Sequence, residues 1–157
     1  MRATLNYNQL SNIEETLEDF KVLLTRYRSI KGNQTKLKKF YSRNRNPIWD
    51  VTNCNYFKTG LISEDVKNNP LTKQVDDHYI QRTKAMRFIF SELDKDEDMN
   101  VDRFIELLRK YCSTVVLSKD EHSMVTGVAK KNPTYLNYES YLACKIQVDG
   151  LSDFMLN

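Results

Sequence analysis

The chain contains little cysteine, glycine and proline, and it has no long apolar run. Its 157 residues include three cysteines, four glycines and three prolines. Cysteines that are odd in number and far apart match neither a disulfide framework nor a Cys-x-x-Cys metal site. So few glycines and prolines exclude a fibrous chain and a many-turned β-barrel. Because no segment approaches the ~20 apolar residues of a membrane span and no signal-peptide pattern is evident, we expect no membrane partner and an intracellular location.

The residues that are present suffice for a folded core. Hydrophobic residues make up 40% of the chain and charged residues 29%, a balance that is typical of globular proteins rather than disordered ones. The length fits a single domain over residues 1–157. Helical periodicity predominates and short β-branched runs interrupt it, so the expected fold class is α+β and helix-rich.

Positive charge is concentrated in one early segment. The net charge of the chain is +3, yet residues 21–49 carry nine bases and no acid, so the remainder is net acidic. Phe40, Tyr41 and Trp49 lie among these bases and offer faces on which nucleic-acid bases can stack. The segment is either a solvated basic surface or a nucleic-acid-binding arm within residues 1–49. The candidate DNA contacts are Arg28, Lys31, Lys36, Lys38, Lys39, Arg43 and Arg45.

Three segments have the apolar spacing of amphipathic helices. Ser11 and Glu14 form a capping-box pattern that predicts a helix from Ser11 to about Tyr27. Two further helices are expected over residues 79–93 and 101–111. Residues 47–74 lack regular periodicity, which predicts a loop-rich stretch with at most short strands.

A strand followed directly by a helix is predicted in the last third of the chain. Residues 113–117 are mostly β-branched, which is typical of a strand. Ser118 and Glu121 then form a second capping-box pattern. The helix that starts there carries His122 on its first or second turn. The closing segment, residues 133–157, fits either a helix or a final strand.

An acidic connector joins the second and third predicted helices. Asp94, Asp96 and Asp98 occupy the first, third and fifth positions of a helix-loop-helix calcium site. However, Met99 stands where the tight turn needs glycine, and Ile105 stands where a bidentate glutamate closes the shell. The pattern therefore favours a solvated connector over a calcium site.

The chain has two histidines, and each follows an acid. Taken singly, each is most commonly a surface histidine or one with a structural partner. Together, His78 after Asp77 and His122 at a helix start fit phosphodiester hydrolysis, which needs an activated water and a divalent cation. Imidazole is a suitable base because its pKa is about 6.5. A neighbouring carboxylate on an extended segment points the other way and is a hard ligand for magnesium or manganese.

These residues resemble the His-Me finger nucleases, also called HNH or endonuclease VII-like, of phage type. In that family an Asp-His pair ends one strand, and an Asn or a His arrives at the start of the helix after a second strand. The resemblance covers residues 70–132 and implies a small ββα-metal core with a helical insertion. It is carried by the stretch from Val75 to Arg82 and by the stretch from Tyr111 to His122.

The resemblance also implies a role for each residue of the pattern. His78 would activate water, Asp77 and His122 would bind one Mg²⁺ or Mn²⁺, and Arg82 would hold a phosphate group. The zinc-binding cysteine pairs of endonuclease VII are absent from this chain. The counterpart of the asparagine that orients the base in many relatives stays open between Ser113, Thr114 and Asn100.

The expected function is that of a metal-dependent endodeoxyribonuclease that hydrolyses phosphodiester bonds of double-stranded DNA in the cytoplasm of a host cell. The family includes free-standing homing endonucleases, so site-specific cutting is one expected form. Two cuts by so small a chain call for a homodimer or for sequential action. The alternatives are a non-catalytic nucleic-acid-binding protein that uses residues 21–49, and a scaffold or inhibitor protein with a basic face. Metal dependence distinguishes the enzyme from a binding protein, whereas salt dependence does not.

Overall fold

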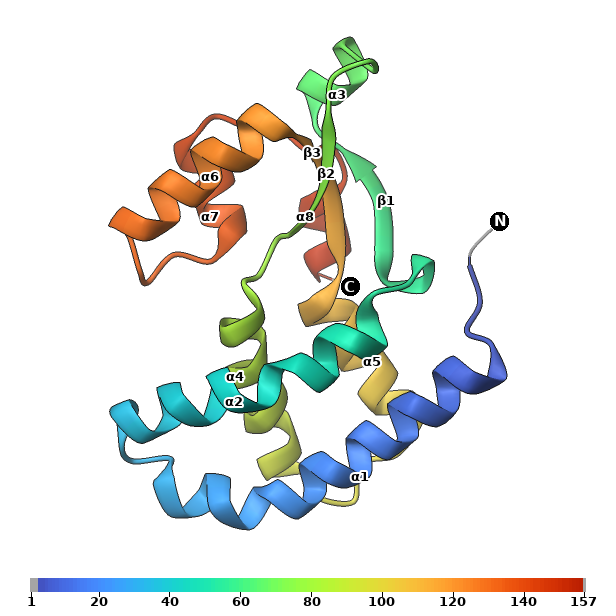
Figure 1. Ribbon diagram of the computed structural model, residues 1–157, viewed down its shortest axis with the longest axis vertical. Coiled ribbons are helices and arrows are strands. Elements are labelled where there is room, and N and C mark those ends of the chain that lie inside the picture. Colours follow the sequence, from blue (N-terminus) through green and yellow to red (C-terminus); the bar gives the residue numbers. More distant parts are fainter. Residues whose placement is uncertain (1–2, 157) are drawn as a thin grey trace. The chain divides into compact units, whose positions relative to one another are not determined.

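The computed structural model describes residues 3–156, whose contacts group into two compact units (Figure 1). The first, which we call the helical unit, joins the chain up to Phe57 with Arg82–Tyr111. The second, the sheet unit, joins Lys58–Gln81 with the chain from Cys112 onward. No helix within residues 3–156 has the length and apolar character that crossing a membrane requires. The expectation of one domain over residues 1–157 stays a prediction.

The fold is rich in helix and has one small sheet, so the expected α+β class is confirmed at this level. The helical unit contains α1 (Tyr7–Ile30), α2 (Gln34–Thr52), the 3-10 turn η1 (Asn55–Phe57), α4 (Arg82–Lys95) and most of α5 (Val101–Cys112). The sheet unit contains β1 (Lys58–Ile62), α3 (Glu64–Asn68), β2 (Gln74–His78), β3 (Thr114–Ser118), α6 (Lys119–Lys131), α7 (Asn137–Ala143) and α8 (Leu151–Leu156).

The core of the helical unit is a cluster of aromatic rings from α1, α2 and α4. Phe90 of α4 is fully buried. Its ring centroid lies 4.9 Å from those of Phe20 and Phe40 and 5.5 Å from that of Tyr27. Ring pairs at these separations attract each other beyond the area that they bury. The apolar stripe that predicts the first helix is therefore the face that α1 buries in this cluster.

Several helix boundaries differ from the sequence prediction, among them both ends of α4, which spans Arg82–Lys95 instead of residues 79–93. Helix α1 begins at Tyr7, four residues early, because Asn6 and Gln9 supply a capping box upstream of the predicted one. Helix α2 continues through Pro47 to Thr52, where a loop is expected from the sequence. Ile48 and Thr52 are both buried and extend the inward face of the helix beyond the proline. Burial thus outweighs the helix-breaking effect of one proline.

The two helices expected on either side of the acidic connector are present as α4 and α5. The start of the connector contacts α1 and its C-terminal cap. The carboxylate of Asp94 lies 2.6 Å from Nε of Arg28 and 3.1 Å from Nζ of Lys31, and Glu97 lies 3.0 Å from Nη1 of Arg28. The Arg28 guanidinium, aided by Lys31, lowers the pKa of Asp94. The first residue of the calcium-like pattern is thus the partner of two bases.

Replacing Arg28 with Gln should lower the melting temperature at neutral pH, and this loss should disappear in acid. Because the pKa of Asp94 is depressed in the fold, its ion pair stabilises the protein above the pKa of the unfolded chain. That contribution is lost as the pH falls through the folded value. Thermal unfolding of wild type and Arg28→Gln, followed from neutral pH into acid, checks this convergence.

The matched control is Arg26→Gln, which removes the same charge from an exposed arginine of α1. Its melting temperature should equal that of wild type throughout, because Arg26 has no ion pair with an acid in the described part of the chain. A deficit of Arg28→Gln that persisted in acid would show that the lost stability does not come from the pairing with Asp94.

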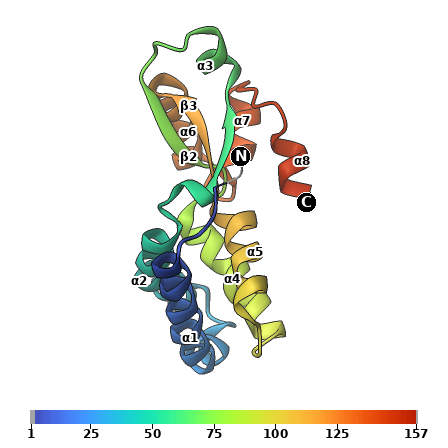
Figure 2. The same ribbon diagram turned by 90° about the vertical axis from the view of Figure 1, so that its right-hand side faces the viewer.

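The three strands form one sheet in the order β1-β3-β2 (Figure 2). Strands β2 and β3 are antiparallel, whereas β1 and β3 are parallel. Helix α6 follows β3 without a loop and packs against β2 and β3. The order strand, strand, helix that the sequence predicts around the two histidines is therefore present as β2, β3 and α6, with α4 and α5 inserted in the chain between the two strands.

Helix α6 begins where the second capping-box pattern predicts. The Ser118 hydroxyl accepts a hydrogen bond from the Glu121 backbone (3.2 Å), and the Glu121 carboxylate accepts one from the Ser118 backbone (2.9 Å). The hydroxyl of Ser63 donates to the same carboxylate at 2.6 Å. These bonds place His122 on the first turn of α6. The closing segment forms two short helices and one isolated bridge between Val148 and Ser63.

Candidate active site

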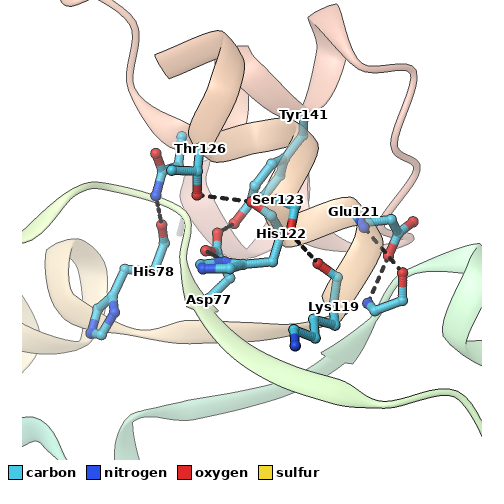
Figure 3. Close-up of polar contacts among 10 residues, drawn as sticks. Asp77, His78, Lys119, Glu121, His122, Ser123, Thr126 and Tyr141 are labelled. Atoms are coloured by element: carbon cyan, nitrogen blue, oxygen red, sulfur yellow. Dashed lines mark hydrogen bonds and ion pairs between the residues drawn. The ribbon is translucent and has the colours of Figure 1, made fainter. Parts of the chain in front are cut away.

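Strand β2 and helix α6 bring Asp77 and His122 into direct contact (Figure 3). Nδ1 of His122 lies 2.7 Å from Oδ1 of Asp77, although the two residues are 45 positions apart in the chain. Asp77 pairs with Val115 in the β2–β3 register, and α6 begins directly after β3. The strand register and the cap of α6 therefore position this pair.

Asp77 is a buried carboxylate with a partner for each oxygen. Its side chain is 4% exposed. Oδ1 faces His122, and Oδ2 accepts a hydrogen bond from the hydroxyl of Tyr141. Burial raises the pKa of Asp77, while the hydrogen bonds from Tyr141 and His122 oppose that rise. A buried carboxylate needs such partners, and here they hold it in one orientation with one oxygen toward His122.

Tyr141 is a member of the site that the sequence does not reveal. It lies on α7 with a buried side chain. Burial and the charge of Asp77 raise the pKa of its hydroxyl, so the group stays protonated and donates. In the sequence it is only one position of a helical pattern. A buried tyrosine hydroxyl generally needs a hydrogen-bond partner, but this rule does not say which residue the partner is. The sequence therefore could not identify Asp77 as the partner of Tyr141.

His78 follows Asp77 on β2, and its imidazole points away from the Asp77–His122 pair (Figure 3). Because successive side chains of a strand point to opposite faces of the sheet, His78 and Asp77 lie on different faces. The side chain is half-buried, and the His78 carbonyl accepts a hydrogen bond from the Asn137 side chain at the start of α7. The end of β2 is thereby anchored, and the imidazole lies apart from the carboxylate that faces His122.

Three residues are candidates for orienting His78, and the strand register favours one of them. Thr114 is the direct partner of His78 across β2 and β3, so the two side chains lie on the same face of the sheet. Its hydroxyl is buried and has no hydrogen-bond partner among residues 3–156. Asn100 belongs to the helical unit, where its side chain caps α5 at the backbone of Arg103. Ser113 is buried just before β3.

The Asp77–His122 pair offers a carboxylate and an imidazole, both of which are ligand types for divalent cations. Residues 3–156 contain no group of three His, Cys, Asp or Glu side chains that could hold a metal ion. Magnesium, however, commonly takes one or two protein ligands and fills its other positions with water. The two side chains hydrogen-bond to each other at 2.7 Å, and a bound cation would replace that hydrogen bond. His122 is 41% exposed, so water can complete the shell.

The predicted phosphate and DNA contacts lie in the helical unit. Arg82 is the first residue of α4, and its guanidinium covers the ring of Trp49. Arg28 and Lys31 are engaged by acids of the connector, as described above. The other candidate contacts are exposed on α2, and none of them has an ion pair with an acid in the described chain. They are Lys36, Lys38, Lys39, Arg43 and Arg45.

Comparisons with known proteins add no further assignment. No protein-family model matches the chain, and no significant similarity to a curated protein or to a solved structure was found. A functional assignment therefore depends on the chemistry of the site itself.

Proposed function

We propose that the protein is a divalent-metal-dependent DNA endonuclease whose ββα-metal core consists of β2, β3 and α6. The observation that carries this proposal is the 2.7 Å contact between Asp77 and His122, with His78 next to Asp77 at the end of β2. An acid and a helix histidine supply two ligands for a cation, and the strand histidine supplies a separate base. Phosphodiester hydrolysis requires both functions.

His78 is the general base in this proposal. A neutral imidazole accepts a proton from water near physiological pH. Thr114 is the residue that we expect to orient it, because its buried hydroxyl lies on the same face of the sheet and has no hydrogen-bond partner within residues 3–156, so it is available to the imidazole. A hydroxyl that accepts the Nδ1 proton leaves Nε2 to receive the proton from water.

Asp77 and His122 are the residues that would hold Mg²⁺ or Mn²⁺. When bound, the cation would neutralise the charge that develops on the phosphate and on the departing 3′ oxygen. Asp77 contributes its charge, and Tyr141 keeps the carboxylate oriented. His122 would hold the cation through Nδ1, the atom that faces Asp77. Arg82 is assigned to a phosphate group of the DNA.

Replacing Tyr141 with Phe should weaken cation binding by roughly 10-fold or more, the usual cost of removing a group that orients a metal ligand. The substitution keeps the ring and removes only the hydroxyl that donates to Oδ2 of Asp77. The measurement is a calorimetric titration with Mn²⁺ in the absence of DNA. Tyr138→Phe makes the same change on the same helix and should bind Mn²⁺ like wild type. Equal affinities of Tyr141→Phe and wild type would disprove the positioning role.

Non-catalytic nucleic-acid binding is the second candidate function, and the exposed bases of α2 favour it. Five lysines and arginines on that helix lack an acidic partner in the described chain. Contacts of this kind attach a protein to the phosphate backbone without reading the base sequence. This candidate predicts binding of duplex DNA with or without a divalent cation and cleavage in neither case.

Incubation of the purified protein with supercoiled plasmid separates the two candidates. We expect nicked or linear product with magnesium and with manganese, and none with chelator. Linear product at low enzyme concentration would indicate cutting of both strands, and a steep dependence on protein concentration would indicate a homodimer. Discrete fragments would indicate site-specific cutting of the homing type. Binding without cleavage under all three conditions would overturn the nuclease proposal.

A further inference from the structure

Arg45, Trp49 and Arg82 form a cationic group within the helical unit. The Cζ atom of Arg82 lies 3.1 Å from the centroid of the Trp49 ring, so the guanidinium covers the indole. Arg45 lies one turn before Trp49 on α2, and its Nη1 donates to the hydroxyl of Thr83 at 3.2 Å. Thr83 directly follows Arg82 on α4. Trp49 and Thr83 therefore hold the two guanidinium groups near each other. We call Arg45 and Arg82 the arginine pair.

Two guanidinium groups held close together repel each other. Burial and the positive charge of Arg45 lower the pKa of Arg82, yet arginine does not lose its proton in proteins. Neither member of the arginine pair has an ion pair with an acid within residues 3–156. Asp50, the acid of α2, lies five residues after Arg45 and so about 140° round the helix. The repulsion is thus not offset by the described chain, and a bound anion would offset it.

Two other arginines of the helical unit, Arg28 and Arg103, differ from the arginine pair because they contact acids. Arg28 contacts two carboxylates of the connector. Arg103 contacts the carboxylates of Glu106 and Glu92. The fold therefore supplies acids to Arg28 and Arg103, and it supplies a tryptophan face and a hydroxyl to the arginine pair.

We propose that Arg45 and Arg82 bind one phosphodiester group of DNA between them, with Trp49 as the platform that orients Arg82. The planar fork of each guanidinium matches phosphate oxygens. Lys38 lies on the same side of α2 as Arg45, two turns and about 10.5 Å away, so a polyanion along this helix contacts both. A single free anion could contact only one end of that row of bases. This inference rests on the proposed function, because it identifies a backbone contact of the same DNA substrate.

Trp49 is the one tryptophan of the chain, so its fluorescence reports on the arginine pair directly. Short duplex DNA, added with chelator present, should change the emission of wild type in a saturable way. Inorganic phosphate at the same phosphate concentration should leave the emission unchanged. Saturation by inorganic phosphate alone would identify a free-anion site and overturn the assignment to DNA. DNA binding, seen by anisotropy of labelled DNA, without any change in emission would overturn the site itself.

The double variant Arg45→Gln/Arg82→Gln tests how much the arginine pair contributes to the affinity for DNA. Loss of one phosphate contact should weaken DNA binding about five- to tenfold near physiological salt and reduce the slope of log affinity against log salt by about 0.9. The control Lys21→Gln/Arg26→Gln removes the same total charge from α1 and should keep the slope of wild type. A wild-type slope in the first double variant would contradict the proposal.

A second variant covers the case in which the Gln substitutions disturb the helical unit. Arg45→Lys/Arg82→Lys keeps both charges but removes the fork and the stacked plane. This variant should keep most of the slope of log affinity against log salt, but its Trp49 emission should no longer change when DNA is added. An unchanged emission response to DNA would contradict the stacking of Arg82 on Trp49. All these measurements are made with chelator and without cleavage. If these binding measurements contradict the role of the arginine pair, the nuclease proposal is not affected. If instead the protein does not cleave DNA but Trp49 still responds to DNA, the role of the arginine pair is not affected.

Discussion

His78→Ala should cleave duplex DNA ~10² to 10⁴-fold more slowly than wild type in magnesium, the usual cost of losing a general base. The reason is that no other imidazole is available: the chain has two histidines, and the second faces Asp77. Binding of DNA in chelator should stay at the wild-type level, because the exposed bases lie on α2 in the helical unit. Single-turnover cleavage of a labelled duplex and anisotropy of the same duplex measure the two quantities.

Imidazole in solution provides the control for His78→Ala. If the lost group is a base, added imidazole should restore part of the cleavage rate of this variant, because it can enter the space that alanine leaves. The same addition should not restore a variant that has lost a cation ligand. Cleavage by His78→Ala at the wild-type rate, without added imidazole, would remove His78 from the mechanism.

Asp77→Asn should lose cation binding and, with it, at least ~10² of the cleavage rate, because the several kcal/mol contributed by a catalytic metal correspond to that factor or more. An amide has the shape of the carboxylate but not the charge that a hard cation requires. It also presents a donor to Tyr141 and His122, which are the donors in wild type. A calorimetric Mn²⁺ titration measures the binding, and cleavage of the labelled duplex measures the rate.

Asp76→Asn is the matched control for Asp77→Asn. Asp76 is the preceding residue of β2, is 43% exposed and pairs with Lys58 at 3.0 Å. The same chemical change there should leave both Mn²⁺ affinity and cleavage near the wild-type values. Loss of Mn²⁺ binding in Asp76→Asn but not in Asp77→Asn would place the ligand on the other carboxylate and contradict the site.

Elements whose signals are local could be predicted from the sequence. The capping box of Ser118 and Glu121 starts α6 at the expected residue, and the apolar spacing of residues 101–111 identifies α5. The continuation of α2 past Pro47 could not be predicted, because it depends on the burial of Ile48 and Thr52 in the folded unit. Propensity at a proline carries no information about such tertiary burial.

Part of the candidate site could be predicted from the sequence, because that part depends on local patterns. Asp77 and His122 are distant in the chain, yet the pattern of strand, cap and helix predicts that they lie together, as they do. Tyr141 and the pairing of Arg28 with Asp94 join segments that no local pattern connects. A segment without acids in the sequence can therefore have acidic partners in space. In this chain the predicted DNA contacts that lack an acidic partner in the described residues all lie on α2.

The most direct test of the central claim compares plasmid nicking by wild type and His78→Ala, purified in parallel, with magnesium and with chelator. We expect nicking by wild type in magnesium, no nicking in chelator, and a rate for His78→Ala lower by at least ~10². Equal nicking by both proteins, or nicking that persists in chelator, would show that the activity does not come from this site and would contradict the account.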